Sequence, residues 1–375
     1  MKRQLFSSLL LLISTLSFAQ DNVHFSEQYK QENQGKYKIE INEVKELVTI
    51  MLAITDYGKG NDDMFEQRGQ YYQDLRAYFE PYENEKIIQT FDSLMVASPY
   101  NYIFLTGNAM TYDFDGDKLV KSDVFIFPAQ GVANVGIDKN PMITYKKEIE
   151  TFAKTSKFRE FYANHQEFYS NIIADYEKNA NLGKQWNWLE TNFETQKNSY
   201  IIFCSPLING LNYTGQFTNN DFSLIYMMLP PLDNYPNLSP FEKEILNTRI
   251  MFTEIDHNYV HTPTEANAEL INHAFADRKF WVNEDVYGTF AYPNPVKVFN
   301  EYMTFGVFLL YCQDQYGQKG TDTAVESVVS MMKERGFPEM KFFTDKLFEM
   351  RAKYPNKKID EWYPEFLNQF SSNQI

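Results

Sequence analysis

The sequence FEKEILNTRIMFTEIDHNYV, residues 241–260, predicts a helix that the rest of the protein encloses. At about 100° per residue, one face gathers only apolar and aromatic side chains: Ile245, Phe252, Ile255 and Tyr259. The other face mixes apolar with chemically active side chains: Leu246, Ile250, Thr253, Glu254, His257 and His261. Because a helix that is apolar on both sides has to be covered on both sides, we expect His257 to lie in a mostly buried setting.

A second helix is predicted from Pro295 to Tyr316, with one carboxylate inside an apolar stripe. The stripe places Glu301 among residues at helical spacing: Val298, Phe305, Phe308 and Cys312. Burial of an ionised carboxylate is costly unless the group is paired or bound to a metal. We therefore expect Glu301 and His257 to be partners, through a hydrogen bond or through a metal ion between them.

Glu254-Ile-Asp-His257 and the later Glu301 together resemble the helix pair of gluzincin metallopeptidases, which carry H-E-x-x-H on one helix and a Glu on a later one. The whole chain resembles an uncharacterised "domain of unknown function" family of secreted bacterial proteins with a zincin-like core. The resemblance covers residues 40–350 and rests on the segments 204–213 and 253–263 and on the Glu301 helix. It implies that His257 and Glu301 bind Zn²⁺ and that Glu254 is the catalytic general base.

The chain departs from the gluzincin pattern at one position, because Thr253 stands where the first histidine ligand is expected. A threonine hydroxyl is a poor Zn²⁺ ligand, so the affinity should fall. Glu254 could enter the ligand set, which would also suit iron or manganese. Alternatively His261 could substitute, although Thr262-Pro263 is expected to end the helix there, or the site could be free of metal.

Two tyrosines precede the Glu301 helix in a loop rich in Gly, Pro and Asn. Tyr287 and Tyr292 could reach a substrate cleft and donate a hydrogen bond to an oxyanion. Core packing or anchoring of the loop is the alternative role for each of them.

The order of predicted elements indicates an α+β fold, mostly helical and zincin-like, with a small antiparallel or mixed sheet packed beside the helix of residues 241–260. Helices are predicted at residues 40–55, 71–79, 84–96, 146–155 and 157–178. Strands are predicted at residues 102–105, 124–127, 200–204 and 222–229, the last two joined by a hairpin-like loop at 206–215. The acidic run Asp113–Asp117 is predicted to be a turn between strands, since a calcium loop would need flanking helices.

Residues 1–19 have the composition of a signal peptide, with Lys2 and Arg3 before an apolar run and Ala19 at the expected cleavage point. We therefore expect an exported protein, periplasmic or extracellular, with no membrane span after cleavage. A loose leader is predicted at 20–39, an N-terminal helical part with a small sheet at 40–232, and a C-terminal helical part with the metal-like site at 233–375. The seam between the two parts is Pro230-Pro231 and the Asn- and Pro-rich loop that follows.

The composition limits the partners that the protein can have. A formal net charge of −15 argues against nucleic acid, which demands positive patches. Cys204 and Cys312 each lie in an apolar segment, where a buried free thiol is commoner than a disulfide. The sequence thus predicts either a zincin-like protein with an altered or degenerate metal site, or a non-catalytic envelope protein that binds a peptide, a protein or a glycan.

Overall fold

The computed structural model describes residues 22–132, 135–233, 237–286 and 288–370, and these form two compact units. The N-terminal unit contains the described residues of 22–176 and 197–232. The C-terminal unit contains those of 177–196 and 233–370. The boundary after Leu232 falls at the predicted seam, but residues 177–196 group with the second unit and not, as expected, with the first.

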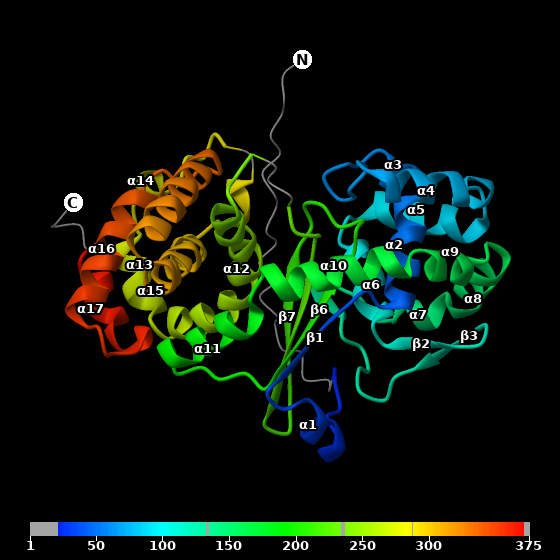
Figure 1. Ribbon diagram of the computed structural model, residues 1–375, viewed down its shortest axis with the longest axis horizontal. Helices are drawn as coiled ribbons and strands as arrows, with labels where there is room; N and C mark the ends of the chain where they lie inside the picture. The colour runs from blue at the N-terminus through cyan, green and yellow to red at the C-terminus, as the bar shows by residue number, and fades with distance from the viewer. Residues whose placement is uncertain (1–21, 133–134, 234–236, 287, 371–375) are drawn as a thin grey trace. The chain divides into compact units, whose positions relative to one another are not determined.

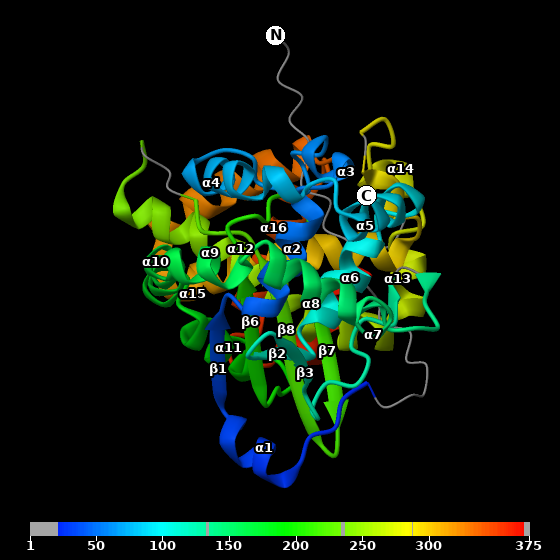
Figure 2. The ribbon, with the colours of Figure 1, turned by 90° about the vertical axis from the view of Figure 1, so that its right-hand side faces the viewer.

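The N-terminal unit contains a four-stranded mixed sheet (Figure 1), and Figure 2 shows its strands in the order β1-β6-β8-β7. Its strands are β1 (Lys36–Glu40), β6 (Ser199–Cys204), β7 (Tyr213–Asn219) and β8 (Phe222–Leu229). The first three strands in that order are parallel, and only β7 runs antiparallel to its neighbour β8. The expected hairpin between residues 200–204 and 222–229 is therefore wrong, because β6 and β8 pair in parallel.

A two-residue turn explains the extra strand β7. Asn220 and Asp221 both have positive φ, 50° and 60°, as a type I′ hairpin turn requires. Asn and Asp tolerate this conformation better than other non-glycine residues. The turn pairs β7 with β8, so residues 213–215, predicted to lie in a loop, are part of a strand.

Helices α2 (Glu43–Ala53) and α6 (Asn101–Ala109) cover one face of this sheet (Figure 2). The Nζ of Lys45 on α2 lies 4.3 Å from the ring centroid of Tyr226 on β8. Thr106 on α6 contacts the sulfur of Met228 on the same strand. Since β8 is buried along its whole length, it is the centre of the core of this unit.

Two of the predicted strands are wrong. Residues 102–105 lie inside α6, where every residue from Tyr102 to Ala109 is buried. A short apolar run cannot reveal its period when all sides of the helix are covered. Residues 124–127 form no strand, and Phe125 makes an isolated bridge to Val23.

The described part of the expected loose leader is ordered. It contains α1 (Glu27–Asn33) and most of β1, and Val23 and Phe25 are buried. Ser26 caps α1 by accepting a hydrogen bond from the amide of Tyr29, which explains why this polar segment forms a helix.

A buried polar chain joins α2 to the helices beside it. The hydroxyl of Tyr71 donates to Glu46 over 2.8 Å and lies 2.7 Å from the hydroxyl of Tyr169. Burial raises the pKa of Glu46 to about 7, although hydrogen bonds from Ser205 and Tyr71 oppose the rise. Glu46 is therefore a carboxylic acid that ionises near neutral pH.

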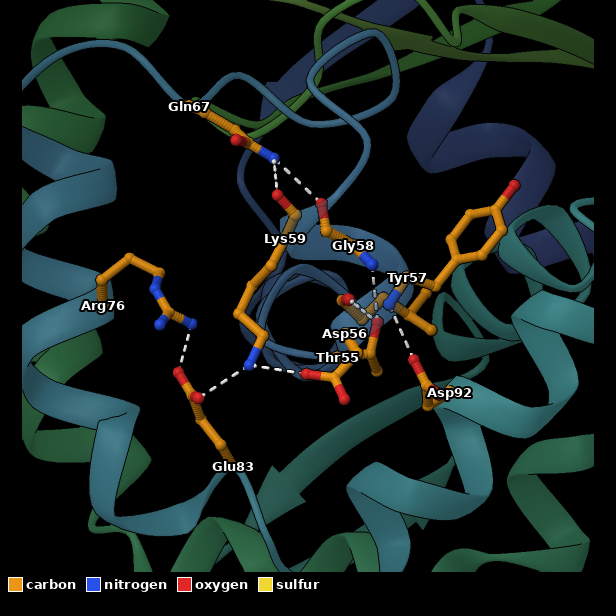
Figure 3. A network of polar contacts seen from close by, with 10 residues as sticks. Thr55, Asp56, Tyr57, Gly58, Lys59, Gln67, Arg76, Glu83 and Asp92 are labelled. Carbon is orange, nitrogen blue, oxygen red and sulfur yellow. Dashed lines mark hydrogen bonds and ion pairs between the residues drawn. The ribbon is translucent and has the colours of Figure 1, made fainter.

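The short helix α3 (Asp56–Lys59) is held by a network of polar contacts (Figure 3). Asp92 accepts a hydrogen bond from the amide of Tyr57, and Lys59 forms ion pairs with Asp56 and Glu83. A Cβ on Gly58 would come within 2.2 Å of the backbone oxygen of Leu52, so only glycine fits between the two helices.

The remaining elements of the N-terminal unit surround these. The predictions at 71–79, 84–96 and 146–155 are confirmed, and the segment 157–178 is two helices because the chain turns at His165. The acidic run 113–117 is a turn only in part, because Asp113 and Asp115 lie in β2 and only Gly116-Asp117 form the turn to β3. The elements are α4 (Gln70–Phe79), η1 (Glu80–Tyr82), α5 (Lys86–Ala97), β2 (Tyr112–Asp115), β3 (Lys118–Lys121), β4 (Gly131–Val132), β5 (Val135–Gly136), α7 (Pro141–Thr144), α8 (Lys146–Thr155), α9 (Phe158–Asn164) and α10 (Gln166–Asn179).

The C-terminal unit is helical in its described residues and is built on the long helices α12 (Pro240–Ala266) and α15 (Pro295–Glu334), which lie side by side (Figure 1). Both predicted helices are thus confirmed and extended. Ser239 and Glu242 form a capping box at the start of α12. Pro263 does not end α12 as expected, whereas Gly317, with φ 63°, breaks the regular geometry of α15. The other elements are α11 (Leu182–Asn192), α13 (Ala268–Ala274), α14 (Arg278–Trp281), η2 (Thr289–Ala291), α16 (Met340–Lys353), η3 (Ile359–Trp362) and α17 (Tyr363–Asn368).

The α+β prediction is therefore confirmed in its broad class: a mostly helical protein with a small mixed sheet. Cys204 and Cys312 are both buried free thiols. Across the described ranges, none of the helices combines the length and the apolar character needed to cross a membrane.

Candidate functional site

Helices α12 and α15 run antiparallel and bring the predicted site residues together within the C-terminal unit. Three contacts in succession fix their register: Thr248 with Tyr316, Phe252 with Phe308, and His257 with Thr304. The contact takes in Phe252 from the predicted apolar face of α12 and His257 from its mixed face. As a result His257 and Glu301 are both enclosed, with 6% and 0% of their surfaces exposed.

Thr253 turns its hydroxyl back onto its own helix. Its Oγ1 donates to the carbonyl oxygen of Arg249 over 3.0 Å and lies 3.4 Å from that of Ile250. This is the usual hydrogen bond of a threonine inside a helix, and it uses the only proton of the hydroxyl. The side chain at the position of the expected first metal ligand is therefore hydrogen-bonded to the backbone of its own helix.

His257 is a neutral, hydrogen-bonded residue in this structure. Its Nδ1 lies 3.1 Å from the Oγ1 of Thr304 on α15. Burial lowers the pKa of His257 to about 4, although the charge of Glu301 opposes the shift. Because Nδ1 is engaged, Nε2 is the ring nitrogen that could hold a further partner.

Glu301 is paired with an arginine that the sequence analysis did not single out. The Nη2 of Arg335 donates to Oε1 of Glu301 over 2.7 Å and to the hydroxyl of Tyr292 over 3.2 Å. The side chain of Arg335 is only 9% exposed, and that of Glu301 is fully buried. The partner of Glu301 is thus Arg335, and no hydrogen bond joins it to His257 in the described structure.

Arg335 is fixed by its place at the end of α15. It follows the last residue of that helix, and its backbone amide bonds to the carbonyl of Met331. Its guanidinium carbon lies 5.2 Å from the ring centroid of Phe305 and 5.9 Å from that of Phe337. Burial would lower the pKa of this arginine, but Glu301 and Tyr292 raise it, so the group stays charged.

Arg335 could not be recognised from the sequence as a site residue. A basic residue followed by Gly336 is the common way for a helix to end, since it complements the helix dipole. Only the folded arrangement shows that this side chain returns to a carboxylate 34 positions earlier.

Two further carboxyl groups on α12 are buried in this region. Burial raises the pKa of Glu254 to about 8, and Glu301 adds to the rise while Arg335 opposes it. Burial, Glu254 and Glu301 hold the pKa of Asp256 well above its usual range. Both oxygens of Asp256 are buried, and the backbone amide of His257 opposes the rise. Burial among these side chains thus favours the protonated form of Glu254 at neutral pH.

The other candidates lie in different settings. Tyr292 is 5% exposed and its hydroxyl accepts from Arg335, so it anchors the cluster. Tyr287 lies outside the described residues. His261 is exposed on α12, one turn beyond His257.

These side chains do not fit the zinc site that the resemblance implies. A catalytic zinc site takes three protein ligands. Here Thr253 is bonded to its own helix, and Glu301 already has a cationic partner. Within the described ranges, no three His, Cys, Asp or Glu side chains are grouped so that they could hold a metal ion. We therefore derive no step of catalysis through a metal.

No protein-family model, curated protein or solved structure matches this chain. The zincin-like core therefore stays a prediction made from the residues of α12 and α15.

Proposed function

We propose that this chain is an exported, zincin-like protein with a degenerate metal site, which binds a peptide or protein and does not hydrolyse it. The observation that carries the proposal is the hydrogen bond from Thr253 to the carbonyl of Arg249. It commits the only proton of this hydroxyl to the backbone of its own helix, and a threonine hydroxyl is in any case a poor Zn²⁺ ligand. The signal-like composition of residues 1–19 supports export.

The charges of the cluster support the same proposal. Glu301 and Arg335 neutralise each other, so this buried carboxylate already has a counter-charge. The cluster therefore needs no divalent cation to balance it.

A peptide or protein is the ligand class that we favour over a glycan. Glycan sites commonly display exposed aromatic rings. In the described residues most aromatic side chains are packed in the core, and the large exposed ones are Tyr37, Phe168 and Phe290.

Metal content and hydrolysis, measured on the same protein, test the proposal. Protein purified without a histidine tag should hold far less than one metal ion per chain. It should release no peptides from denatured casein, with or without added Zn²⁺, and Glu254→Gln should behave in the same way. Retention of unfolded casein on the immobilised protein would support the binding role.

One metal ion per chain, together with a hydrolysis that Glu254→Gln abolishes, would overturn the proposal. That result would favour a working site built from Glu254, His257 and Glu301.

A further inference from the structure

We infer that Arg335 is a built-in cation of the site, which holds Glu301 in place of a divalent metal ion and excludes such an ion. The inference rests on the proposed function, because it explains why the site works without metal. Beyond that function, the inference names Arg335 as the residue that decides whether a metal ion can bind.

The guanidinium of Arg335 opposes the binding of a second cation at Glu301. Arg335 and Glu301 are in hydrogen-bond contact over 2.7 Å, and both side chains are nearly or fully buried. A metal ion on this carboxylate would lie within a few ångströms of the guanidinium, where little water screens the repulsion. Tyr292 and the rings of Phe305 and Phe337 hold the guanidinium, so it cannot swing away freely.

The carboxylate of Glu301 has a second oxygen to which Arg335 does not donate. Oε2 of Glu301 is buried, and the hydrogen bond from Arg335 goes to the other oxygen, Oε1. If Arg335 lost its charge, both oxygens of an enclosed carboxylate would lack a counter-charge. Such a group either takes up a proton or attracts a cation.

The opposite helix could supply nitrogen ligands with one change. Thr253 and His257 are one turn apart on α12, so a histidine at position 253 would stand on the same side of the helix as His257. Together with Glu301 these would form two imidazoles and a carboxylate, which suits zinc. Two substitutions should then be needed, one to add a ligand and one to remove the built-in cation.

Four proteins test this: the full-length wild type, Thr253→His, Arg335→Met, and the double variant. Zn²⁺ binding is measured by calorimetry and by metal analysis after dialysis, and Co²⁺ is used as a probe with a visible absorption band. We expect the double variant to bind one Zn²⁺ about 100-fold more tightly than Thr253→His alone. The wild type and Arg335→Met should bind weakly or not at all.

Arg335→Lys in the Thr253→His background is the matched control for charge. It shortens the side chain but keeps the cation, so it should leave zinc binding as weak as in Thr253→His alone. Tight binding by this control would overturn the inference.

The other outcomes are equally decisive. If Thr253→His binds Zn²⁺ as tightly as the double variant, Arg335 is no barrier and the inference fails, while the proposed function stands. If a folded double variant binds none, His257 and Glu301 cannot be ligands and the inference also fails. If no neutral variant at 335 folds, Thr253→His decides: no zinc binding supports the inference and tight binding overturns it. Metal in the wild type would refute the proposed function itself.

Discussion

Replacement of Glu301 by Gln should destabilise the C-terminal unit strongly. The change keeps the shape of the side chain but leaves the charge of Arg335 buried without its counter-ion. Two unit charges about 4 Å apart attract each other by about 4 kcal/mol at an effective dielectric of about 20. Measured losses on breaking a buried pair from one side are about 3–5 kcal/mol. We therefore expect the free energy of unfolding to fall by about 3–5 kcal/mol.

Tryptophan fluorescence during urea unfolding is a suitable assay. All four tryptophans, Trp186, Trp188, Trp281 and Trp362, lie in the C-terminal unit, so their emission follows that unit alone. Glu349→Gln is the matched control, because it breaks a more exposed ion pair with Lys346 in the same unit. Its effect should stay below about 1 kcal/mol.

The double variant Glu301→Gln/Arg335→Met separates the cost of an unpaired charge from the loss of packing. With neither charge left, the unit should regain much of its stability, as buried pairs replaced by apolar groups usually do. If Glu301→Gln costs no more than Glu349→Gln, or if the double variant is the least stable of all, the reasoning about the Arg335–Glu301 pair is wrong.

Three further predictions concern other parts of the chain. For Glu46, a folded-state pKa of about 7 against 4.5 in the unfolded chain means that the native state holds the proton more tightly. The contribution of Glu46 to the free energy of unfolding is therefore fully present below pH 4.5 and is lost as the pH rises through 7. The loss is about 3 kcal/mol, at 1.36 kcal/mol per pKa unit. Glu46→Gln should remove this dependence of the unfolding free energy on pH, measured by urea unfolding followed by circular dichroism. An unchanged dependence on pH would contradict the prediction. Gly58→Ala should lower the free energy of unfolding by about 3 kcal/mol, because the new Cβ meets a backbone oxygen. Gly215→Ala is the control and should be tolerated, because a Cβ there has nothing within 4 Å. Equal melting temperatures of the two variants would contradict this prediction. Tyr302→Phe should lower the free energy of unfolding by about 1–3 kcal/mol, since the buried hydroxyl of Tyr302 donates to the carbonyl of Trp281. Urea unfolding followed by tryptophan fluorescence measures this loss, and a loss below that range would contradict the prediction.

The long helices of the C-terminal unit could be predicted because their apolar residues repeat at helical spacing. Phe252 and Phe308, each placed on an apolar face by that spacing, do pack against one another. The same reasoning failed for residues 102–105, where all sides of the helix are covered and no period is visible. It also missed β7, whose signal is the turn Asn220-Asp221 followed by the buried strand β8.

The site could be predicted as a place but not as a set of contacts. Helical spacing showed that His257 and Glu301 would be enclosed, and both are. Their partners, Thr304 and Arg335, depend on the register between α12 and α15 and on where α15 ends. Neither quantity is written in the local pattern of one helix.

The order of the chain through its two units has a consequence for biosynthesis. Helix α11 leaves the ribosome before β6, β7 and β8 exist, yet its Trp188 packs on Phe252 and Tyr311, which are made later still. Strand β1 likewise cannot pair until β6, the strand beside it in the described sheet, has been made. A fragment that stops at residue 232 would carry α11 with its apolar side uncovered, so no single cut separates the units cleanly. To produce the N-terminal unit alone, residues 177–196 would have to be replaced by a short polar linker.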